Sequence, residues 1–447
     1  MTKLRIKTMI GIILLSVFIG LPLHGAEYDY VDITNPFLRK TPMAIVPFKH
    51  QTENLTANQV STNALNLLSE TLVFTGYFKV IEDNAFPVDP SKTDIIVSTV
   101  DYGKWIHFGA ELLITGSLVV EENILEVELR LYDTFKEKLV IGKRYKGAVS
   151  DYRRMIHRFC SEVIHYITGS FGFFNSKIAF LSNGSGHKEI YIAEFDGLNP
   201  VQQTHDNTIV LFPSWSSDGK WLSYTSFLKG KPDIYIRHLT ENRGAVLEKE
   251  GTNMPGGWVP GTLTLGATLS YSGDQEIYLL TETGKIIKRL TYARGIDVSP
   301  SFSPDGKKMA FVSKRSGTPQ IYIMDLASET VDRLTFHGQY NTEPAWSPKG
   351  DKIAFSGLNE GKNDIYIIGV DGQGLMRLTQ NERDNESPSW SPDGSLIVFS
   401  STREGPSRIY VMTAFGTDQR RLLVLPGEQF APRWSPNLVS HPTSSFN

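Results

Sequence analysis

Three aspartates stand in short turn-like motifs and are the first candidates for chemistry in this chain. Asp218, Asp305 and Asp393 each lie between a Ser-Ser or Ser-Pro pair and a glycine. Carboxylates brought together could act as a general acid and a general base. The motif also suits a tight turn, because proline presets φ, aspartate bonds its own backbone and glycine accepts the final geometry. Since the motif recurs at regular intervals, we expect structural turns and no catalytic residue.

Histidines could instead hold a metal ion in a lyase or hydrolase. The candidates are His187, His205, His238 and His337, but only His205 and His337 are expected in loops that could face one another. A nucleophile is no better supported, because Gly184-Ser185-Gly186 lacks the Gly-x-Ser-x-Gly spacing. The chain also has no His-Glu-x-x-His, no paired cysteines and no phosphate loop. The sequence therefore predicts no enzyme, no metal site and no cofactor, and a metal-dependent propeller enzyme remains the alternative.

The elements that position these residues follow from a repeat. Six Ile-Tyr pairs are separated by 44, 43, 44, 44 and 44 residues, a period typical of a β-propeller blade. Such a unit cannot bury both faces alone, so the units must pack around a ring. The predicted fold is an N-terminal α/β domain followed by an all-β six-bladed β-propeller. The pairs begin at Ile190, Ile234, Ile277, Ile321, Ile365 and Ile409.

A second motif, Pro-x-Trp-Ser-Pro-Asp-Gly or a close variant, runs in phase with these pairs. Its copies begin at Pro213, Pro300, Pro344, Pro388 and Pro432, and the first step of 87 residues equals two periods. The absent copy falls near residues 255–258 and indicates a degenerate second blade. We expect the tryptophans to pack between blades. The alternative is a glycan- or peptidoglycan-binding module whose tryptophans stack on sugars.

The two ends of the repeat array complement each other. Residues 176–180 begin with the second strand of a blade, whereas Trp434-Ser435-Pro436 ends the array without the strand that should follow. We therefore expect the C-terminal strand to complete the first blade and to hide the free sheet edges.

The region before the propeller shows no repeat and mixes helical and strand patterns. We expect strands at 43–48, 78–82, 112–120, 125–132 and 139–145, and helices at 56–74 and 151–168, with a loop-rich stretch around Gly103 and Trp105. The domains are predicted as residues 1–26 (signal peptide), 27–170 (α/β domain) and 171–447 (propeller).

The N-terminus and the composition limit where in the cell the protein can act and which partners it can have. Lys3, Arg5 and Lys7 precede an apolar run over residues 9–19, which is typical of a cleavable signal peptide. A membrane anchor is the alternative, but the run is shorter than the roughly 20 residues a span needs, so we expect no membrane insertion after cleavage. Cys160 is the single cysteine, and we expect a buried, inert thiol. The net charge of −3 shows no overall excess of basic residues of the kind that indicates nucleic-acid binding.

Taken together, the signal peptide, the small α/β domain and the six blades with these motifs resemble the TolB family of the Tol-Pal system of Gram-negative envelopes. The departures are the decayed second blade and Lys349 in place of aspartate. The resemblance implies a monomeric, non-enzymatic periplasmic scaffold that supports outer-membrane integrity and constriction at cell division. It also implies that the propeller binds the lipoprotein Pal at one mouth of its channel, and that the mature N-terminal segment binds the C-terminal domain of TolA.

Two sets of binding residues follow. The residues that lead into each innermost strand should ring the channel mouth, where their polar and acidic groups would favour a partner with amide and cationic groups or could hold Ca²⁺. They could also be ordinary solvated loop residues. The predicted mouth residues are Asp206, Asn207, Thr208, Asn253, Arg294, Asp297, Asn341, Thr342, Glu343, Asn385, Glu386 and Gln429.

The N-terminal segment alternates polar and apolar residues, so it could add as a strand to a partner's sheet edge or dock on its own domain. This predicted segment comprises Glu27, Tyr28, Asp29, Tyr30, Val31, Asp32 and Ile33.

Overall fold

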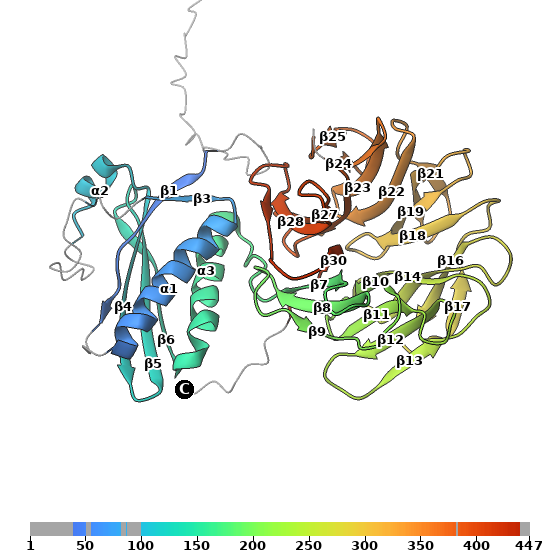
Figure 1. The fold of residues 1–447 in the computed structure, drawn as a ribbon. Helices are drawn as coiled ribbons and strands as arrows, with labels where there is room; N and C mark the ends of the chain where they lie inside the picture. The colour runs from blue at the N-terminus through green and yellow to red at the C-terminus, as the bar shows by residue number, and fades with distance from the viewer. Residues whose placement is uncertain (1–38, 51–54, 82–85, 87–99, 381–382, 439–447) are drawn as a thin grey trace, which may run out of the picture. The chain divides into compact units, whose positions relative to one another are not determined.

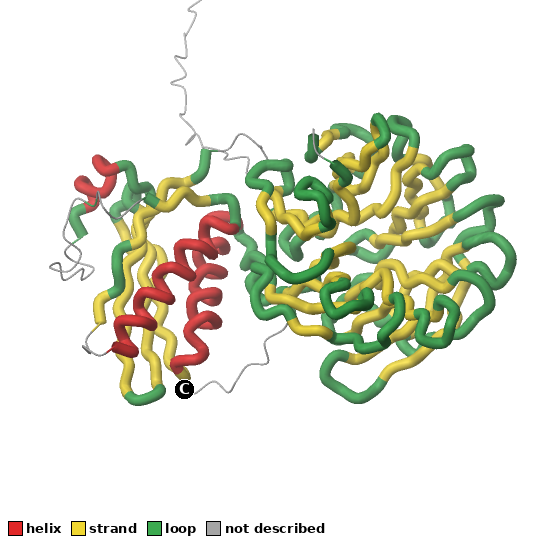
Figure 2. Tube along the Cα trace, viewed as in Figure 1, coloured by secondary structure: helices red, strands yellow, loops and turns green. Residues whose placement is uncertain are grey.

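The computed structural model describes residues 39–50, 55–81, 86, 100–380 and 383–438. Within them the chain forms an α/β region and then a β-propeller (Figure 1). Figure 2 shows the long helices confined to the first region, while the propeller consists of strands and loops. The predicted signal peptide and the segment Glu27 to Ile33 lie outside the described residues.

The α/β region is built on a mixed sheet with the strand order β3-β1-β4-β5-β6. Strand β1 runs parallel to β3 and β4, whereas β4, β5 and β6 form the predicted antiparallel part. Leu125, Val127 and Leu129 of β5 are fully buried and alternate with partly exposed charged residues, as the period of two predicts. The strands are β1 (Thr41–Ile45), β2 (Lys49–His50), β3 (Phe78–Val80), β4 (Leu112–Glu121), β5 (Ile124–Asp133) and β6 (Lys138–Ala148).

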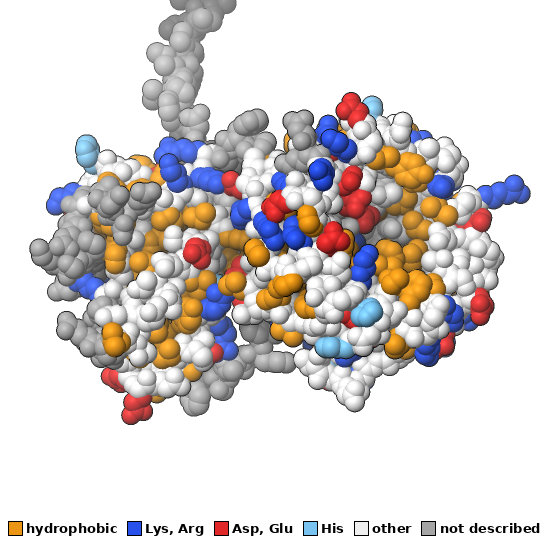
Figure 3. Space-filling model, viewed as in Figure 1, with side chains coloured by type: hydrophobic (Ala, Val, Ile, Leu, Met, Phe, Trp, Pro, Cys, Tyr) orange, Lys and Arg blue, Asp and Glu red, His pale blue; other side chains and the backbone are white. Residues whose placement is uncertain are grey.

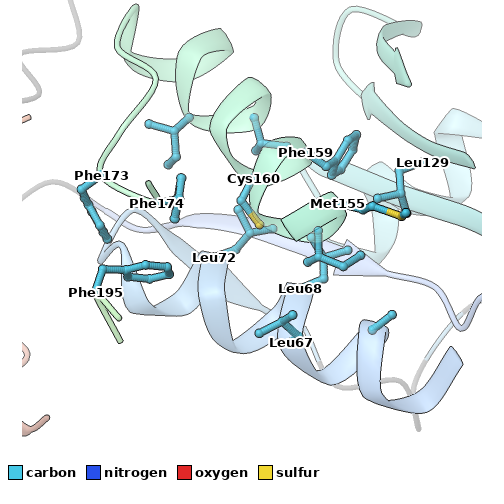
Figure 4. Close-up of a cluster of buried hydrophobic side chains, with 14 of the residues drawn as sticks. Leu67, Leu68, Leu72, Leu129, Met155, Phe159, Cys160, Phe173, Phe174 and Phe195 are labelled. Atoms are coloured by element: carbon cyan, nitrogen blue, oxygen red, sulfur yellow. The ribbon is translucent and has the colours of Figure 1, made fainter. Parts of the chain in front are cut away.

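Two long helices, α1 (Leu55–Phe74) and α3 (Tyr152–Thr168), share one hydrophobic core with this sheet. Figure 4 shows Cys160 of α3 directed toward Leu68 and Leu72 of α1. The thiol is fully buried, and burial raises its pKa. The prediction of a buried cysteine is therefore confirmed, and an un-ionised thiol is a poor nucleophile.

One helix was not predicted. The stretch expected to be loop-rich contains α2 (Tyr102–Phe108). The carboxylate of Asp101 accepts a hydrogen bond from the backbone N–H of Lys104, and Gly109 ends the helix in the left-handed region at φ 88°. Buried Trp105 holds this short helix against the domain. The expectation of a loop around Gly103 and Trp105 was therefore wrong.

Each of the six blades is a four-stranded sheet, with the innermost strand followed by the Ser-Pro turn, the second strand, the Ile-Tyr strand and a short outer strand. The first five sheets consist of β10 (Val210–Trp215), β11 (Trp221–Ser226), β12 (Asp233–His238) and β13 (Gly244–Leu247); β14 (Asn253–Trp258), β15 (Thr264–Leu269), β16 (Glu276–Thr281) and β17 (Ile286–Arg289); β18 (Asp297–Phe302), β19 (Lys308–Ser313), β20 (Gln320–Asp325) and β21 (Val331–Arg333); β22 (Tyr340–Trp346), β23 (Lys352–Asn359), β24 (Lys362–Gly369) and β25 (Met376–Arg377); β26 (Asn385–Trp390), β27 (Leu396–Ser401), β28 (Arg408–Thr413) and β29 (Arg420–Arg421).

The sixth sheet joins both ends of the array. Its order is β30-β7-β8-β9, and each strand is antiparallel to its neighbour. The strands are β30 (Gln429–Trp434), β7 (Lys177–Ser182), β8 (Glu189–Glu194) and β9 (Val201–Gln202). The indole Nε1 of Trp434 donates a hydrogen bond to Ser176 Oγ at 2.6 Å, across 258 residues of sequence. The closure that the two ends of the array predict is present, and it pairs strand edges that would otherwise be open.

The aspartates of the repeat motif form turns. Asp305 Oδ1 accepts hydrogen bonds from Ser303 Oγ at 2.6 Å and from the backbone N–H of Lys307 at 3.1 Å. Gly306 follows with φ 69°, a conformation that glycine adopts without strain. These carboxylates are used in local hydrogen bonds, so the structural interpretation of the motif is confirmed.

A hydrogen-bonded triad holds the outer part of a blade. In the third blade, Thr335 Oγ1 accepts from the backbone N–H of Ile321 at 2.9 Å and donates to Gln320 Oε1 at 2.8 Å. Two blades lack this threonine: the blade β10–β13 has Glu248 at the equivalent position, and the blade β26–β29 has Leu423. In the blade β10–β13 the buried Asp233 Oδ2 has no hydrogen-bond partner among the described residues. The blade with the decayed motif, β14–β17, keeps both its strands and this triad, because Thr291 Oγ1 accepts from the backbone N–H of Ile277 at 2.9 Å and donates to Glu276 Oε2 at 2.5 Å.

Candidate binding channel

A cavity of about 470 Å³ lies at the axis of the propeller. Its walls come from the second half of each innermost strand and from the Ser-Pro turn that follows, so proline, serine and tryptophan dominate the lining. The lining tryptophans are Trp215, Trp258, Trp346, Trp390 and Trp434, each less than 10% exposed. Because each of these rings is packed into the structure, little of it is free to stack on a sugar.

A bulge in the innermost strands shapes this wall. In five blades the residue three positions before the tryptophan or phenylalanine has positive φ, and the ladder shifts register at this point. These residues are Phe212, Ser299, Glu343, Ser387 and Ala431. Such a bulge bends the strand and redirects a side chain. Phe212, Ser299 and Glu343 line the cavity as a result.

The position directly before the tryptophan or phenylalanine faces the axis in all six blades. Five copies carry a small residue there and the sixth carries Arg433; all six line the cavity. The small residues are Ser214, Gly257, Ser301, Ala345 and Ser389. Arg433 therefore projects into a ring of small side chains.

Glu343 and Arg433 are the two charged residues that line the cavity among those the structure describes. Glu343 accepts hydrogen bonds from Ser356 Oγ at 2.8 Å, from the Ser387 N–H at 2.8 Å and from Ser387 Oγ at 2.7 Å. Arg433 Nη1 donates to the carbonyl oxygens of Pro432 at 2.9 Å and Ser387 at 3.5 Å. The surrounding strands desolvate the guanidinium and lower the pKa of Arg433, although the Glu343 carboxylate opposes this shift.

The predicted mouth residues fall into two groups. Five of them are the first or second residues of innermost strands, at most 2% exposed, with side chains turned into the blades. Asn341 Nδ2 donates to Gln320 Oε1 at 2.8 Å, and Asp297 pairs with Arg315 at 2.9 Å. Asn341 thus braces the connection to the preceding blade, whereas Asp297 is paired within its own blade, and a partner would not reach either buried side chain. The buried five are Asn253, Asp297, Asn341, Asn385 and Gln429.

The remaining seven keep exposed surface. Asn207, Arg294 and Glu386 are exposed, whereas Asp206, Thr208, Thr342 and Glu343 are half-buried. Of the twelve, Glu343 alone is among the described residues that line the cavity. The other eleven predicted residues lie toward the beginning of the innermost strands, whereas the cavity lies along the second half of these strands. The sequence thus grouped residues that the structure separates along the channel.

The pKa of Glu386 is raised. The largest cause is desolvation of the carboxyl group by the protein around it, although the side chain keeps exposed surface; the Glu343 carboxylate adds to the shift, and a hydrogen bond from Asn363 Nδ2 at 2.5 Å partly offsets it. Figure 3 shows acidic and basic side chains interspersed on the face drawn. A partner at this mouth would meet groups of both signs, because Arg294 and Glu386 are both exposed.

The histidines do not converge. His187, His205 and His337 are exposed, and His238 is buried against Trp221. In the described part of the chain, no group of three or more His, Cys, Asp or Glu side chains is placed to hold a metal ion.

Two family models match this architecture. One described as the TolB beta propeller domain matches residues 164–438, and one described as the TolB amino-terminal domain matches residues 29–140. The chain belongs to the TolB family. The resemblance drawn from the Ile-Tyr pairs and the Pro-x-Trp motifs is therefore confirmed.

Relatives and a solved TolB structure agree. A Tol-Pal system protein TolB of Desulfosudis oleivorans is 54% identical over 286 residues, which are 64% of this chain and 65% of that protein. A TolB homolog of Chlorobium chlorochromatii is 40% identical over 295 residues, 66% of each chain. These alignments span just under two thirds of the relatives' length. The crystal structure of TolB from Acinetobacter baumannii is similar with a TM-score of 0.78 at 26% identity, covering 89% of this chain and 97% of that one.

Arg433 was not predicted from the sequence as a functional residue. The signal was available, because the residue directly before the tryptophan or phenylalanine is small in five blades and arginine in one. Among the helices described, none is long and apolar enough to cross a bilayer.

Proposed function

We propose that this TolB-family protein is a monomeric, non-enzymatic scaffold of the Tol-Pal system in the periplasm. It binds the lipoprotein Pal at a mouth of the propeller channel and the C-terminal domain of TolA through its mature N-terminal segment. The observation that carries the proposal is the closed six-bladed ring with the TolB motifs, together with motif aspartates that are used in turns.

The Pal site is proposed at the beginning of the innermost strands. Asn207, Arg294 and Glu386 are exposed there and offer amide, cationic and carboxylate groups. Buried neighbours such as Asn341 and Asn385 fix the loops through hydrogen bonds to the preceding blade. A surface held in place before binding loses little conformational entropy on association, so these buried residues support affinity without touching Pal.

The TolA site is proposed in the segment from Glu27 to Ile33. Its alternation of polar and apolar side chains suits addition to the edge of a partner's sheet, where backbone hydrogen bonds supply affinity. Docking of the segment on its own domain is the competing state, and exchange between the two states would couple the segment to the rest of the protein.

A pull-down from envelope extract tests both sites. The full mature chain is expected to retain Pal and TolA, and a variant lacking residues 27–33 is expected to retain Pal and lose TolA. An Asn207→Ala, Glu386→Ala double variant is expected to do the reverse. Retention of both partners by both variants would contradict the proposal.

The cellular role follows from linking an outer-membrane lipoprotein to TolA. Cells that lack the gene are expected to leak periplasmic enzymes and to delay outer-membrane constriction at division. Re-expression of the full chain should restore both properties, and re-expression of the variant lacking residues 27–33 should not.

A further inference from the structure

We propose that the axial cavity binds a monoanionic carboxylate carried on an apolar or aromatic body, with Arg433 as its charged donor. The ligand would enter from the side of the Ser-Pro turns. This inference does not depend on the binding of Pal or TolA, which is placed at other parts of the molecule.

Within the described part of the chain, the Arg433 guanidinium has no carboxylate partner and keeps free donors. Nη1 donates to two backbone carbonyl oxygens, and among the described residues no carboxylate lies within the 4.0 Å of an ion pair. A desolvated guanidinium without a carboxylate partner is costly. Nε and Nη2 remain as donors on a planar group that suits two parallel hydrogen bonds to a carboxylate.

The wall around Arg433 leaves room for a ligand and offers further donors. The residues equivalent to Arg433 in the other blades are small, so the guanidinium has open space beside it. Ser301 Oγ and Ser389 Oγ each accept a backbone N–H, from Trp346 at 3.0 Å and Trp434 at 2.9 Å. A hydroxyl that accepts still has a proton to donate, so both serines can assist an anion in the channel.

The other lining residues favour a particular ligand charge and an apolar ligand body. Glu343 lines the same cavity and acts electrostatically on Arg433. Its carboxylate would repel a dianion more strongly than a monoanion, and Arg433 would repel a divalent cation. Proline and tryptophan side chains make up much of the remaining wall, which favours an apolar body. The volume of about 470 Å³ suits a group of this size.

The test uses N-acetyl-L-phenylalanine, with its neutral amide and inorganic phosphate as comparison ligands. Five of the seven tryptophans line the cavity, so tryptophan fluorescence reports occupancy directly, and calorimetry gives the affinity. We expect saturable binding of the carboxylate, with the amide and phosphate each about tenfold weaker because they lose the bidentate charged contact or gain repulsion.

Substitutions test whether Arg433 and Glu343 form the carboxylate-binding site. Arg433→Gln should weaken carboxylate binding about tenfold or more, Arg433→Lys less, because lysine keeps the charge without the planar fork. Glu343→Gln should tighten it severalfold by removing the repelling charge. Arg237→Gln is the matched control, since this exposed arginine of β12 does not line the cavity, and binding should not change.

Three results would overturn the proposal: no saturable binding of the carboxylate, equal binding of the acid and its amide, or an affinity that Arg433→Gln leaves unchanged. If Arg433→Gln fails to fold, as judged by circular dichroism and melting, the comparison of acid with amide on the unchanged protein and the Glu343→Gln variant still decide it.

Discussion

The indole Nε1 of Trp215 donates a hydrogen bond to the carbonyl oxygen of Arg433 at 3.0 Å, across 218 residues of sequence. Trp215 ends the innermost strand of one blade, and Arg433 lies in β30, which completes the neighbouring blade from the other end of the chain. The contact therefore joins the closing strand to the next blade and holds the backbone of Arg433, one of the two charged residues that line the cavity among those described.

Trp215→Phe should lower the stability of the ring. The substitution leaves a carbonyl oxygen without its donor, which costs roughly 1–3 kcal/mol when the group is buried, and the phenyl ring fills less of the space between blades. Trp346→Phe is the control, because Trp346 Nε1 bonds only within its own turn, to Gly350 at 3.3 Å. Urea unfolding should show a larger loss for Trp215→Phe; equal losses would contradict a role in closure.

The triad in the outer blade makes a second prediction. Thr335→Val keeps the shape of the side chain but removes the acceptor of the Ile321 N–H and the donor to Gln320. Because both partners are buried, we expect a loss of about 2 kcal/mol or more in the free energy of unfolding. Thr283→Val, at an exposed hydroxyl, should change stability little. An unchanged midpoint for Thr335→Val would show that the triad does not stabilise the blade.

The buried His157 predicts that the folded state loses stability in acid. Burial, and then the Arg153 guanidinium, lowers its pKa to about 4, below the 6.5 of an exposed imidazole. The folded state therefore resists a proton that the unfolded state accepts, so stability is lost as the pH falls from 6.5 toward 4, by on the order of 3 kcal/mol. His157→Gln should reduce this loss. His187→Gln, at an exposed position, should not, and identical pH profiles for all three proteins would exclude His157 as the cause.

The raised pKa of Glu386 predicts a pH dependence of stability that is opposite in sign to that of His157. This raised pKa means that the folded state disfavours the carboxylate, so the unfavourable contribution is present at neutral pH and disappears as the pH falls through the folded pKa. Glu386→Gln should therefore raise the melting temperature at neutral pH, and the gain should vanish in acid. Glu360→Gln, at an exposed glutamate, serves as the control. A gain that is the same at both pH values would argue against a charge effect.

The propeller could be predicted because the same pattern of strands recurs in the sequence six times, once for each blade. Ring closure followed from the chain ends, since residues 176–180 and Trp434 each lack what the other supplies. The short helix α2 has too few residues to show a periodic pattern, and its caps, Asp101 and Gly109, were not recognised as a pair.

The channel was harder to predict, for a geometric reason. Residues at the beginning of an innermost strand look like exposed loop residues in the sequence, but Asn341 and Asn385 turn inward to the preceding blade. The bulge before each tryptophan or phenylalanine then shifts the alternation of faces, so a period of two does not tell which side chain meets the axis. Arg433 stands out only when all six copies are compared.

The central claim is that separate parts of one scaffold bind Pal and TolA. The most direct measurement is calorimetric titration of the mature chain, and of the chain lacking residues 27–33, with purified Pal and with the purified C-terminal domain of TolA. We expect both chains to bind Pal with saturable heats, and only the complete mature chain to bind the TolA domain. Undiminished TolA binding by the shortened chain, or no Pal binding by either chain, would contradict the account.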